Sequence, residues 1–299
     1  MAAELARPRV PSAVSALSAG PLAAPARGAR VLAAFPTAVY LALERHDQVL
    51  PLLTREALLL PTGVRLAASS TEVTWGVAPG DVVPVGDGRV ELPTASLVGV
   101  RTWRPVAVDA PDRHAAPSAW SEPVLDAVRG VLTDAVGDGS LRAHGAGLAA
   151  VARTGRDPGP ALRGLVGAGQ GLTPSGDDAV CGVLLALRAL GLRESVPLLR
   201  DALPAVLGRT TSLSASLLTV AADGYAVPEV TRLVRATAAG DLRAVRSALP
   251  GVLAVGHSSG RDLVAGVLGA LDALLDPTLS TPTPTPILVP TPTEGARRG

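Results

Sequence analysis

One glycine-rich segment of the chain combines residue types that could bind a small anion. Four glycines fall within residues 164–171, and a helical pattern follows at once. Glycine leaves the backbone open, so that N–H groups can point at a ligand, as they do in phosphate-binding loops before helices. We therefore predict substrate binding by Gly169, Gly171, Thr173 and Ser175.

Two adjacent carboxylates, Asp177 and Asp178, follow this segment. They would repel an anion unless a cation or an arginine lies between them, so we predict catalytic roles: either both bind a metal ion, with Mg²⁺ as the candidate, or one of them carries a proton. The alternative is a capping box, in which Ser175 caps the helix and Asp178 completes the cap, which leaves Asp177 without a role.

A second segment, Gly256–Asp262, places a histidine and two hydroxyl groups before another helix. We predict that His257 is a catalytic hydrogen-bond donor or proton carrier and that Ser258 and Ser259 bind substrate. The alternative is a structural histidine.

A third segment, Gly208–Ser214, brings an arginine and several hydroxyls to the start of a helical run. Guanidinium and hydroxyl donors together suit a phosphate or a carboxylate, so we predict substrate binding by Arg209, Thr210 and Thr211. The alternative is a solvated helix N-cap.

The elements that must position these segments change character along the chain. Short apolar runs with turn signals dominate residues 29 to 118, including Asp81–Leu92, whose valine-rich arms flank Gly86-Asp87-Gly88 as in a hairpin. Helical periodicity takes over afterwards, and the predicted helices are Pro123–Val136, Leu141–Arg153, Asp178–Leu190, Glu194–Leu207, Pro228–Ala238, Leu242–Leu249 and Asp262–Leu275. The fold class predicted is α+β.

We predict two domains between two tails. The tails are 1–28, rich in Ala, Pro, Arg and Gly, and 277–299, which repeats Thr-Pro. A β-rich domain then covers 29–118, and a helical domain that carries all three motifs covers 119–276.

The helical half contains an internal similarity. Ser175–Leu187 and Ser259–Leu271 are identical at nine of thirteen positions and share a Ser-Gly-x-Asp start. If this is a true pseudo-repeat, a pseudo-twofold arrangement could point two positive helix N-termini into one cleft. Chance similarity between Ala/Leu-rich helices is the alternative.

Composition excludes several function classes. The 27 basic residues are all arginine, which removes lysine Schiff-base chemistry and the GK[ST] phosphate loop, and Leu172 stands where a dinucleotide fingerprint needs its third glycine. A net charge of +1 and 2% aromatic residues argue against nucleic acid as a partner. The single Cys181 fits a reducing compartment, and no apolar run suits a membrane span, so we expect a cytoplasmic protein.

The three motifs together resemble the AllH family, subunits of oxamate carbamoyltransferase. The matching segments are Gly169–Asp178, Thr210–Ser216 and Gly256–Leu263, with weaker likeness over residues 30 to 275. The first of these segments is the most specific. Gln170 and Ala179 depart from the family pattern, whereas the Asp pair and His257 are retained.

The resemblance implies a cytoplasmic bacterial subunit that works with AllF-like and AllG-like subunits. Together they would move a carbamoyl group between oxalurate and phosphate, giving oxamate and carbamoyl phosphate in purine or allantoin breakdown. Family membership does not fix the substrate. Two other functions stay open: a stand-alone metal-dependent hydrolase or amidase that uses the Asp pair, and a non-catalytic structural subunit.

Overall fold

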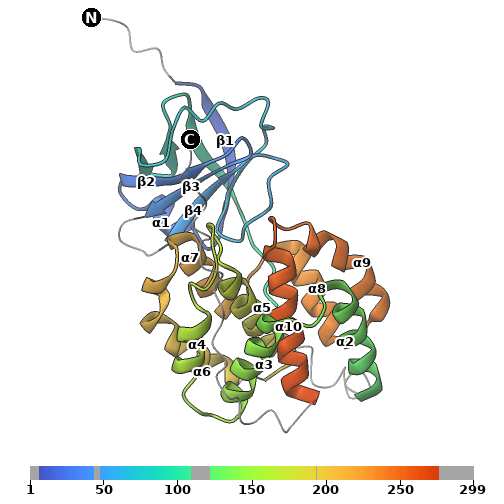
Figure 1. Ribbon diagram of the computed structural model, residues 1–299. Coiled ribbons are helices and arrows are strands. Elements are labelled where there is room, and N and C mark those ends of the chain that lie inside the picture. The colour runs from blue at the N-terminus through green and yellow to red at the C-terminus, as the bar shows by residue number, and fades with distance from the viewer. Residues whose placement is uncertain (1–6, 44–47, 109–121, 193, 276–299) are drawn as a thin grey trace, which may run out of the picture.

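The computed structural model describes residues 7–43, 48–108, 122–192 and 194–275. It has two parts, a β-barrel and a bundle of helices below it in Figure 1. The predicted α+β class is confirmed. No helix in the described ranges has both the length and the apolar character that a membrane crossing needs.

The barrel closes in the strand order β1-β5-β4-β3-β2-β6-β7-β8. Neighbouring strands are antiparallel except for β1 with β8 and β4 with β5, which are parallel. Side chains that alternate inward from these strands build a separate core around Leu41, Leu50 and Leu97. The strands are β1 Arg9–Ser15, β2 Arg27–Ala34, β3 Ala38–Leu43, β4 Gln48–Leu53, β5 Val64–Leu66, β6 Val82–Gly86, β7 Arg89–Glu91 and β8 Ser96–Trp103, with the short helix α1 Ala19–Ala23 between the first two.

The prediction of an N-terminal tail is wrong for residues 9–28. Strand β1 pairs with both β5 and β8, and Val14 enters the barrel core. Small residues suffice here because both edges of the strand are hydrogen-bonded, which closes the barrel without a strongly apolar sequence. Residues 1–6 and 277–299 lie outside the described part of the chain.

The predicted hairpin is confirmed. Strands β6 and β7 are antiparallel, and Gly86 pairs with Arg89. Asp87 and Gly88, with φ of 50° and 77°, form the two-residue loop. Positive φ at both loop residues is the geometry whose twist matches that of the flanking strands.

The helical part follows the predicted order with two additions. Helix α4 was not predicted, and α7 forms where only a helical run was expected after the Arg209 segment. The helices are α2 Glu122–Val136, α3 Ser140–Arg153, α4 Gly159–Leu165, α5 Ser175–Ala189, α6 Ser195–Ala202, α7 Ser212–Ala222, α8 Pro228–Ala238, α9 Leu242–Leu253 and α10 Ser259–Leu275, with 3₁₀ turns at Leu203–Ala205 and Leu207–Arg209.

Helices α5 and α10 lie side by side at the centre of the bundle (Figure 1). A Cβ at Gly182 would overlap the carbonyl oxygen of Leu263, and a Cβ at Gly266 would overlap that of Ala179. The two contacts are reciprocal, because Gly182 matches Gly266 and Ala179 matches Leu263 in the internal similarity. The pseudo-repeat therefore has a structural counterpart in a pseudo-twofold helix crossing.

The segments that lead into these two helices also match. Before α5, the N–H of Ala168 donates to Leu165 O, and the N–H of Gly176 donates to Ala168 O. Before α10, Val255 donates to Val252 O, and Gly260 donates to Val255 O. The same turn thus connects α4 to α5 and α9 to α10, and the loop before α5 is the longer one.

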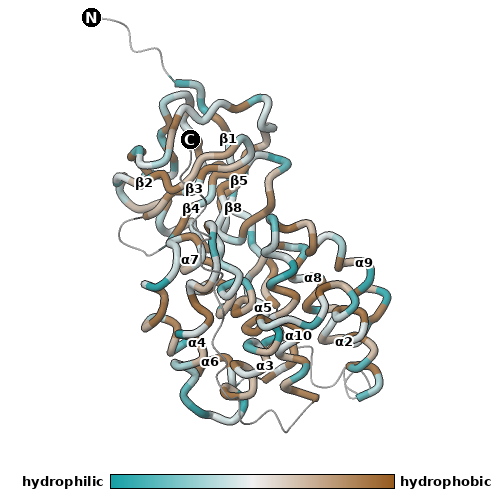
Figure 2. Tube along the Cα trace, viewed as in Figure 1, coloured by the Kyte–Doolittle hydropathy of each residue, from teal (hydrophilic) through white to brown (hydrophobic). Residues whose placement is uncertain are grey.

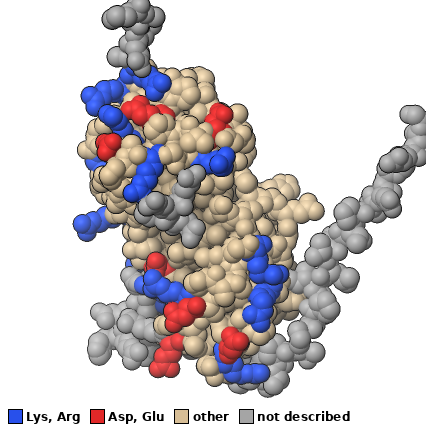
Figure 3. Space-filling view, turned by 90° about the vertical axis from the view of Figure 1, so that its left-hand side faces the viewer, with Lys and Arg blue, Asp and Glu red and all other residues tan. Residues whose placement is uncertain are grey.

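The barrel rests on α7. Strand β4 contacts this helix, and the N–H of Val49 donates to Ser216 Oγ at 3.3 Å. Below the barrel, Val108 is fully buried and its N–H donates to Gly224 O at 2.7 Å. Figure 2 shows hydrophobic residues in both parts, along the barrel strands and along α5. On the face in Figure 3, arginine and acidic side chains are interspersed over both parts.

Candidate functional site

The glycine-rich loop runs between α4 and α5 and is held down at its first residue. Gly167 has φ of 81°, and a Cβ there would overlap the carbonyl oxygen of Arg209. Glycine is needed because the loop backbone passes directly against the turn that precedes α7. Its N–H donates to Asp177 Oδ1 at 2.9 Å.

Asp177 joins this loop to the start of α7. Its side chain is buried, with 1% of the residue exposed. Besides the bond from Gly167, Oδ2 accepts hydrogen bonds from the hydroxyl of Thr210 and, at 2.7 Å, from that of Ser214. Both carboxylate oxygens are thus occupied by donors of the chain itself, so we assign Asp177 a positioning role.

Replacing Asp177 with alanine is expected to lower the free energy of unfolding by about 3 kcal/mol, since three donors to a buried carboxylate lose their acceptor together. Asp177→Asn keeps the volume and one acceptor, and should lose about half as much. Chemical denaturation of both variants measures the difference. Equal stability of Asp177→Ala and the unmodified protein would contradict the assigned role.

Thr211 makes a second connection between the same two motifs. It is the N-cap of α7, and its Oγ1 accepts the N–H of Ser214 at 3.1 Å. The same hydroxyl donates to Leu172 O in the glycine-rich loop at 2.5 Å. The predicted N-cap alternative therefore holds for Thr211, while Thr210 is engaged by Asp177.

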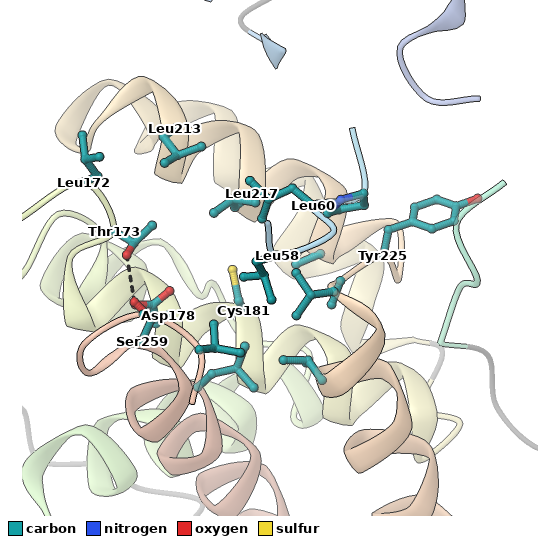
Figure 4. A pocket seen from close by; sticks show the side chains of 18 of the residues that line it. Leu58, Leu60, Leu172, Thr173, Asp178, Cys181, Leu213, Leu217, Tyr225 and Ser259 are labelled. Carbon is teal, nitrogen blue, oxygen red and sulfur yellow. Dashed lines mark hydrogen bonds between the residues drawn. The ribbon is translucent and has the colours of Figure 1, made fainter. Parts of the chain in front are cut away.

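The third motif joins through Thr173 and Ser259. Their hydroxyl oxygens lie 2.9 Å apart, and Figure 4 shows this pair beside Asp178. Ser259 begins α10, as Ser175 begins α5. The loops before the two pseudo-equivalent helices thus meet at this pair of hydroxyls.

Asp178 is the buried titratable group of this meeting point. It is 7% exposed, and among the described residues its Oδ2 has no hydrogen-bond partner. Burial raises the pKa of Asp178 from 3.8 to about 8, with smaller upward contributions from Asp262 and Asp177, while hydrogen bonds from Ser259 and Thr173 oppose the rise. At neutral pH this carboxyl is mostly protonated and can donate a hydrogen bond.

Asp178 faces a cavity of about 250 Å³ between the barrel and the helices. The barrel contributes Leu58 and Leu60, and the helical part contributes apolar side chains of α5, α7 and α8 (Figure 4). Cys181 also lines the cavity, where burial raises the pKa of its thiol well above the ordinary value. The wall is mainly apolar, with the hydroxyl pair and Asp178 at one end.

The structure separates the predicted site residues into two groups. Asp178, Thr173 and Ser259 line the cavity. The others lie outside its lining, and of these Gly169, Gly171, Arg209, His257 and Ser258 are exposed. The glycines, His257 and Ser258 lie in the same loops as cavity residues, and Arg209 lies against Gly167, so together they form the outer surface of the meeting point of the motifs.

The predicted capping box is wrong. Helix α5 begins at Ser175 itself, its N-cap is Pro174, and no side chain caps it. Asp178 is therefore already within the first turn and faces the cavity. Its burial comes from the packing of α5 against α10 and the barrel loop, and local sequence gives no sign of this.

The Asp pair does not fit a shared magnesium ion. Asp177 is occupied by Gly167, Thr210 and Ser214, whereas Asp178 faces the cavity with Ser259 and Thr173. Within the described residues there is no group of three or more His, Cys, Asp or Glu side chains that could hold a metal ion. Mg²⁺ prefers several oxygen ligands around one point, and these two carboxylates do not provide it.

The apolar wall of the cavity was missed in the sequence. Tyr40, Tyr225, Leu213 and Leu217 line it, but each lies in a strand, helix or turn whose pattern also fits ordinary core packing. The weaker family resemblance predicted over residues 30 to 275 includes Tyr40 but indicates no role for it.

Residues 165–271 match the family model of oxamate carbamoyltransferase subunit AllH. The match runs from the end of α4 into α10 and contains all three motifs that meet at the cavity. No solved structure matches the chain. The wider likeness over residues 30 to 275 stays a prediction. Residues 165–271 of the helical part are thus similar to the AllH family of oxamate carbamoyltransferase subunits.

Proposed function

We propose that this chain acts as an AllH-like subunit in carbamoyl transfer between oxalurate and phosphate, which yields oxamate and carbamoyl phosphate. One observation carries the proposal: the three motifs of the family match are connected to one another by the side chains of Asp177, Thr211, Thr173 and Ser259. Residues far apart in the sequence thus form one continuous surface.

The outer side of this surface supports binding of the anionic group. Gly169 and Gly171 are exposed in the loop that leads into α5, and Arg209 is exposed beside this loop. Backbone N–H groups at a helix N-terminus and a guanidinium are both suited to phosphate or carboxylate oxygens. His257 is exposed before α10, and in this proposal it polarises the carbamoyl oxygen.

The inner side supports proton transfer. In the forward reaction a phosphate oxygen attacks the carbamoyl carbon, the bond from that carbon to the oxamate nitrogen breaks, and the nitrogen takes up a proton. A carboxyl that is protonated at neutral pH can supply it. In this proposal Asp178 is the proton donor, and the hydroxyls of Thr173 and Ser259 orient it.

The test is a calorimetric titration of the chain, alone and with its partner subunits, with carbamoyl phosphate, oxalurate, oxamate and phosphate. His257→Ala is expected to weaken binding of carbamoyl phosphate at least about tenfold, or about 1.4 kcal/mol. His144→Ala, on α3 and outside the three motifs, is the matched control.

Two outcomes would contradict the proposal. Binding that is equal in the His257 and His144 variants would remove this surface from anion recognition. Absence of binding by any of the four ligands, in the assembled enzyme as well, would favour a structural subunit whose Asp177, Thr210 and Thr211 serve only to hold loops together.

A further inference from the structure

The interior of the cavity differs chemically from the exposed loops around it. Its walls are mainly leucine, valine and alanine side chains, among them Leu60, Leu185 and Leu217, together with the aromatic side chains Phe35, Tyr40 and Tyr225. No arginine is among the lining residues of the described chain. A dianion that entered would lose its hydration without gaining a counter-charge, which is strongly unfavourable.

One buried oxygen at the polar end of the cavity lacks a hydrogen-bond partner among the described residues. Asp178 is nine-tenths buried, and its Oδ2 is unpaired among the described residues, while Thr173 and Ser259 bond to each other beside it. Asp177 on the same helix and Asp262 on α10 add negative potential around this carboxyl. A buried polar atom left unpaired costs free energy, so a ligand that pairs with it gains specificity as well as affinity.

We propose that this cavity binds a small uncharged molecule whose apolar ring or branched chain fills the leucine-lined interior and whose carbonyl or carboxamide group hydrogen-bonds to Asp178. The site goes beyond the proposed carbamoyl-transfer function, which binds its anion at the exposed loops and uses Asp178 only as a proton donor.

The size of the cavity sets the size of the ligand. An apolar cavity of about 150 Å³ accommodates benzene, so 250 Å³ accommodates a ring with a polar head of about ten non-hydrogen atoms. The head must be neutral. A carboxylate meets three nearby carboxyl groups, and an ammonium or amidinium must lose its hydration in an apolar cavity and also drive the proton off Asp178.

Four probes of one shape separate these chemistries: benzamide, benzoate, benzamidine and toluene. We expect saturable binding of benzamide to the full chain, measured by ligand-observed NMR and calorimetry. The affinity of benzamide should exceed the affinities of benzoate and of benzamidine at least about tenfold. The affinity of toluene should lie between that of benzamide and those of the two charged probes. Tighter binding of benzoate or benzamidine than of benzamide would overturn the neutral-ligand inference.

Variants locate the probe. Leu217→Trp fills the cavity from α7 and should abolish benzamide binding. Leu58→Trp tests the barrel side of the cavity, and because Leu58 is already 38% exposed, this substitution does not disturb a core position. Asp178→Ala should remove the preference for benzamide over toluene, whereas Asp178→Asn, which keeps an N–H donor, should retain it. Benzamide binding that survives in both tryptophan variants would place the ligand elsewhere and refute the inference.

Carbamoyl phosphate is titrated into the same variants. Because its proposed contacts lie on the exposed loops, Leu58→Trp should leave this titration unchanged. Failure of benzamide binding with retained carbamoyl phosphate binding rejects the cavity ligand alone, and the reverse result rejects the proposed function alone.

Discussion

Replacing Asp178 with asparagine is expected to stabilise the protein at pH 9 and to have little effect on stability near pH 4. Burial raises the pKa of the Asp178 carboxyl from 3.8 to about 8, so between these values the folded state holds a proton that the unfolded chain has released. Stability from this group is fully present below pH 3.8 and is lost as the pH rises to about 8. Asparagine stays neutral, so the variant does not lose this stability as the pH rises.

The size of the effect follows from the width of that pH range. Each pH unit between the two values lowers the free energy of unfolding by about 1.4 kcal/mol, so the variant and the unmodified protein should diverge by a few kcal/mol. Denaturant unfolding from pH 4 to 9 measures this directly. Asp201→Asn, at an exposed position on α6, controls for the loss of one carboxylate. Parallel curves for Asp178→Asn and the unmodified protein would contradict a buried, protonated Asp178.

The helical half could be predicted from sequence because its pattern is local. Ala/Leu periodicity gave the order of the long helices, with ends displaced by a few residues, as at α5 and α9. Helix α4 escaped because it spans only Gly159–Leu165 and contains two glycines and a proline, so its stability depends on packing against neighbours.

The barrel was predicted only in part because its closure is not local. The Asp81–Leu92 hairpin has its own turn signal, whereas β1 is made of small residues and gains its place from pairing with two distant strands. A strand whose stability comes from partners fifty or more residues away leaves little trace in its own sequence.

For the site too, the sequence indicates the residue types but not the directions in which their side chains point. The motifs were recognised from glycines, hydroxyls and carboxylates, but adjacent residues on a helix point about 100° apart, so Asp177 and Asp178 face different neighbours. Which one meets the loop and which one meets the cavity depends on the packing of α7, α10 and the barrel around α5. The sequence could indicate the pair, but only tertiary structure separates their roles.

A single methyl group at Gly266 is expected to cost about 3 kcal/mol or more of stability. The Cβ of Gly266→Ala would overlap the carbonyl oxygen of Ala179, a backbone atom that can give way only if α5 and α10 move apart. Gly182→Ala meets Leu263 in the same manner. Gly130→Ala in α2 is the matched control, since its Cβ meets no atom within 4 Å, and it should stabilise by about 0.5 to 1 kcal/mol.

The pseudo-twofold crossing also predicts how the effects of Gly182→Ala and Gly266→Ala combine. Once one methyl group has forced the helices apart, the second has less to displace, so Gly182→Ala combined with Gly266→Ala should cost at least about 1 kcal/mol less than the sum of the single variants. Additive costs would mean that the two contacts are independent. Because this crossing also helps to bury Asp178, and burial is the main cause of its raised pKa, either single variant should weaken the rise in stability that Asp178→Asn gives at pH 9. Helix packing and site chemistry are thereby measured in one experiment.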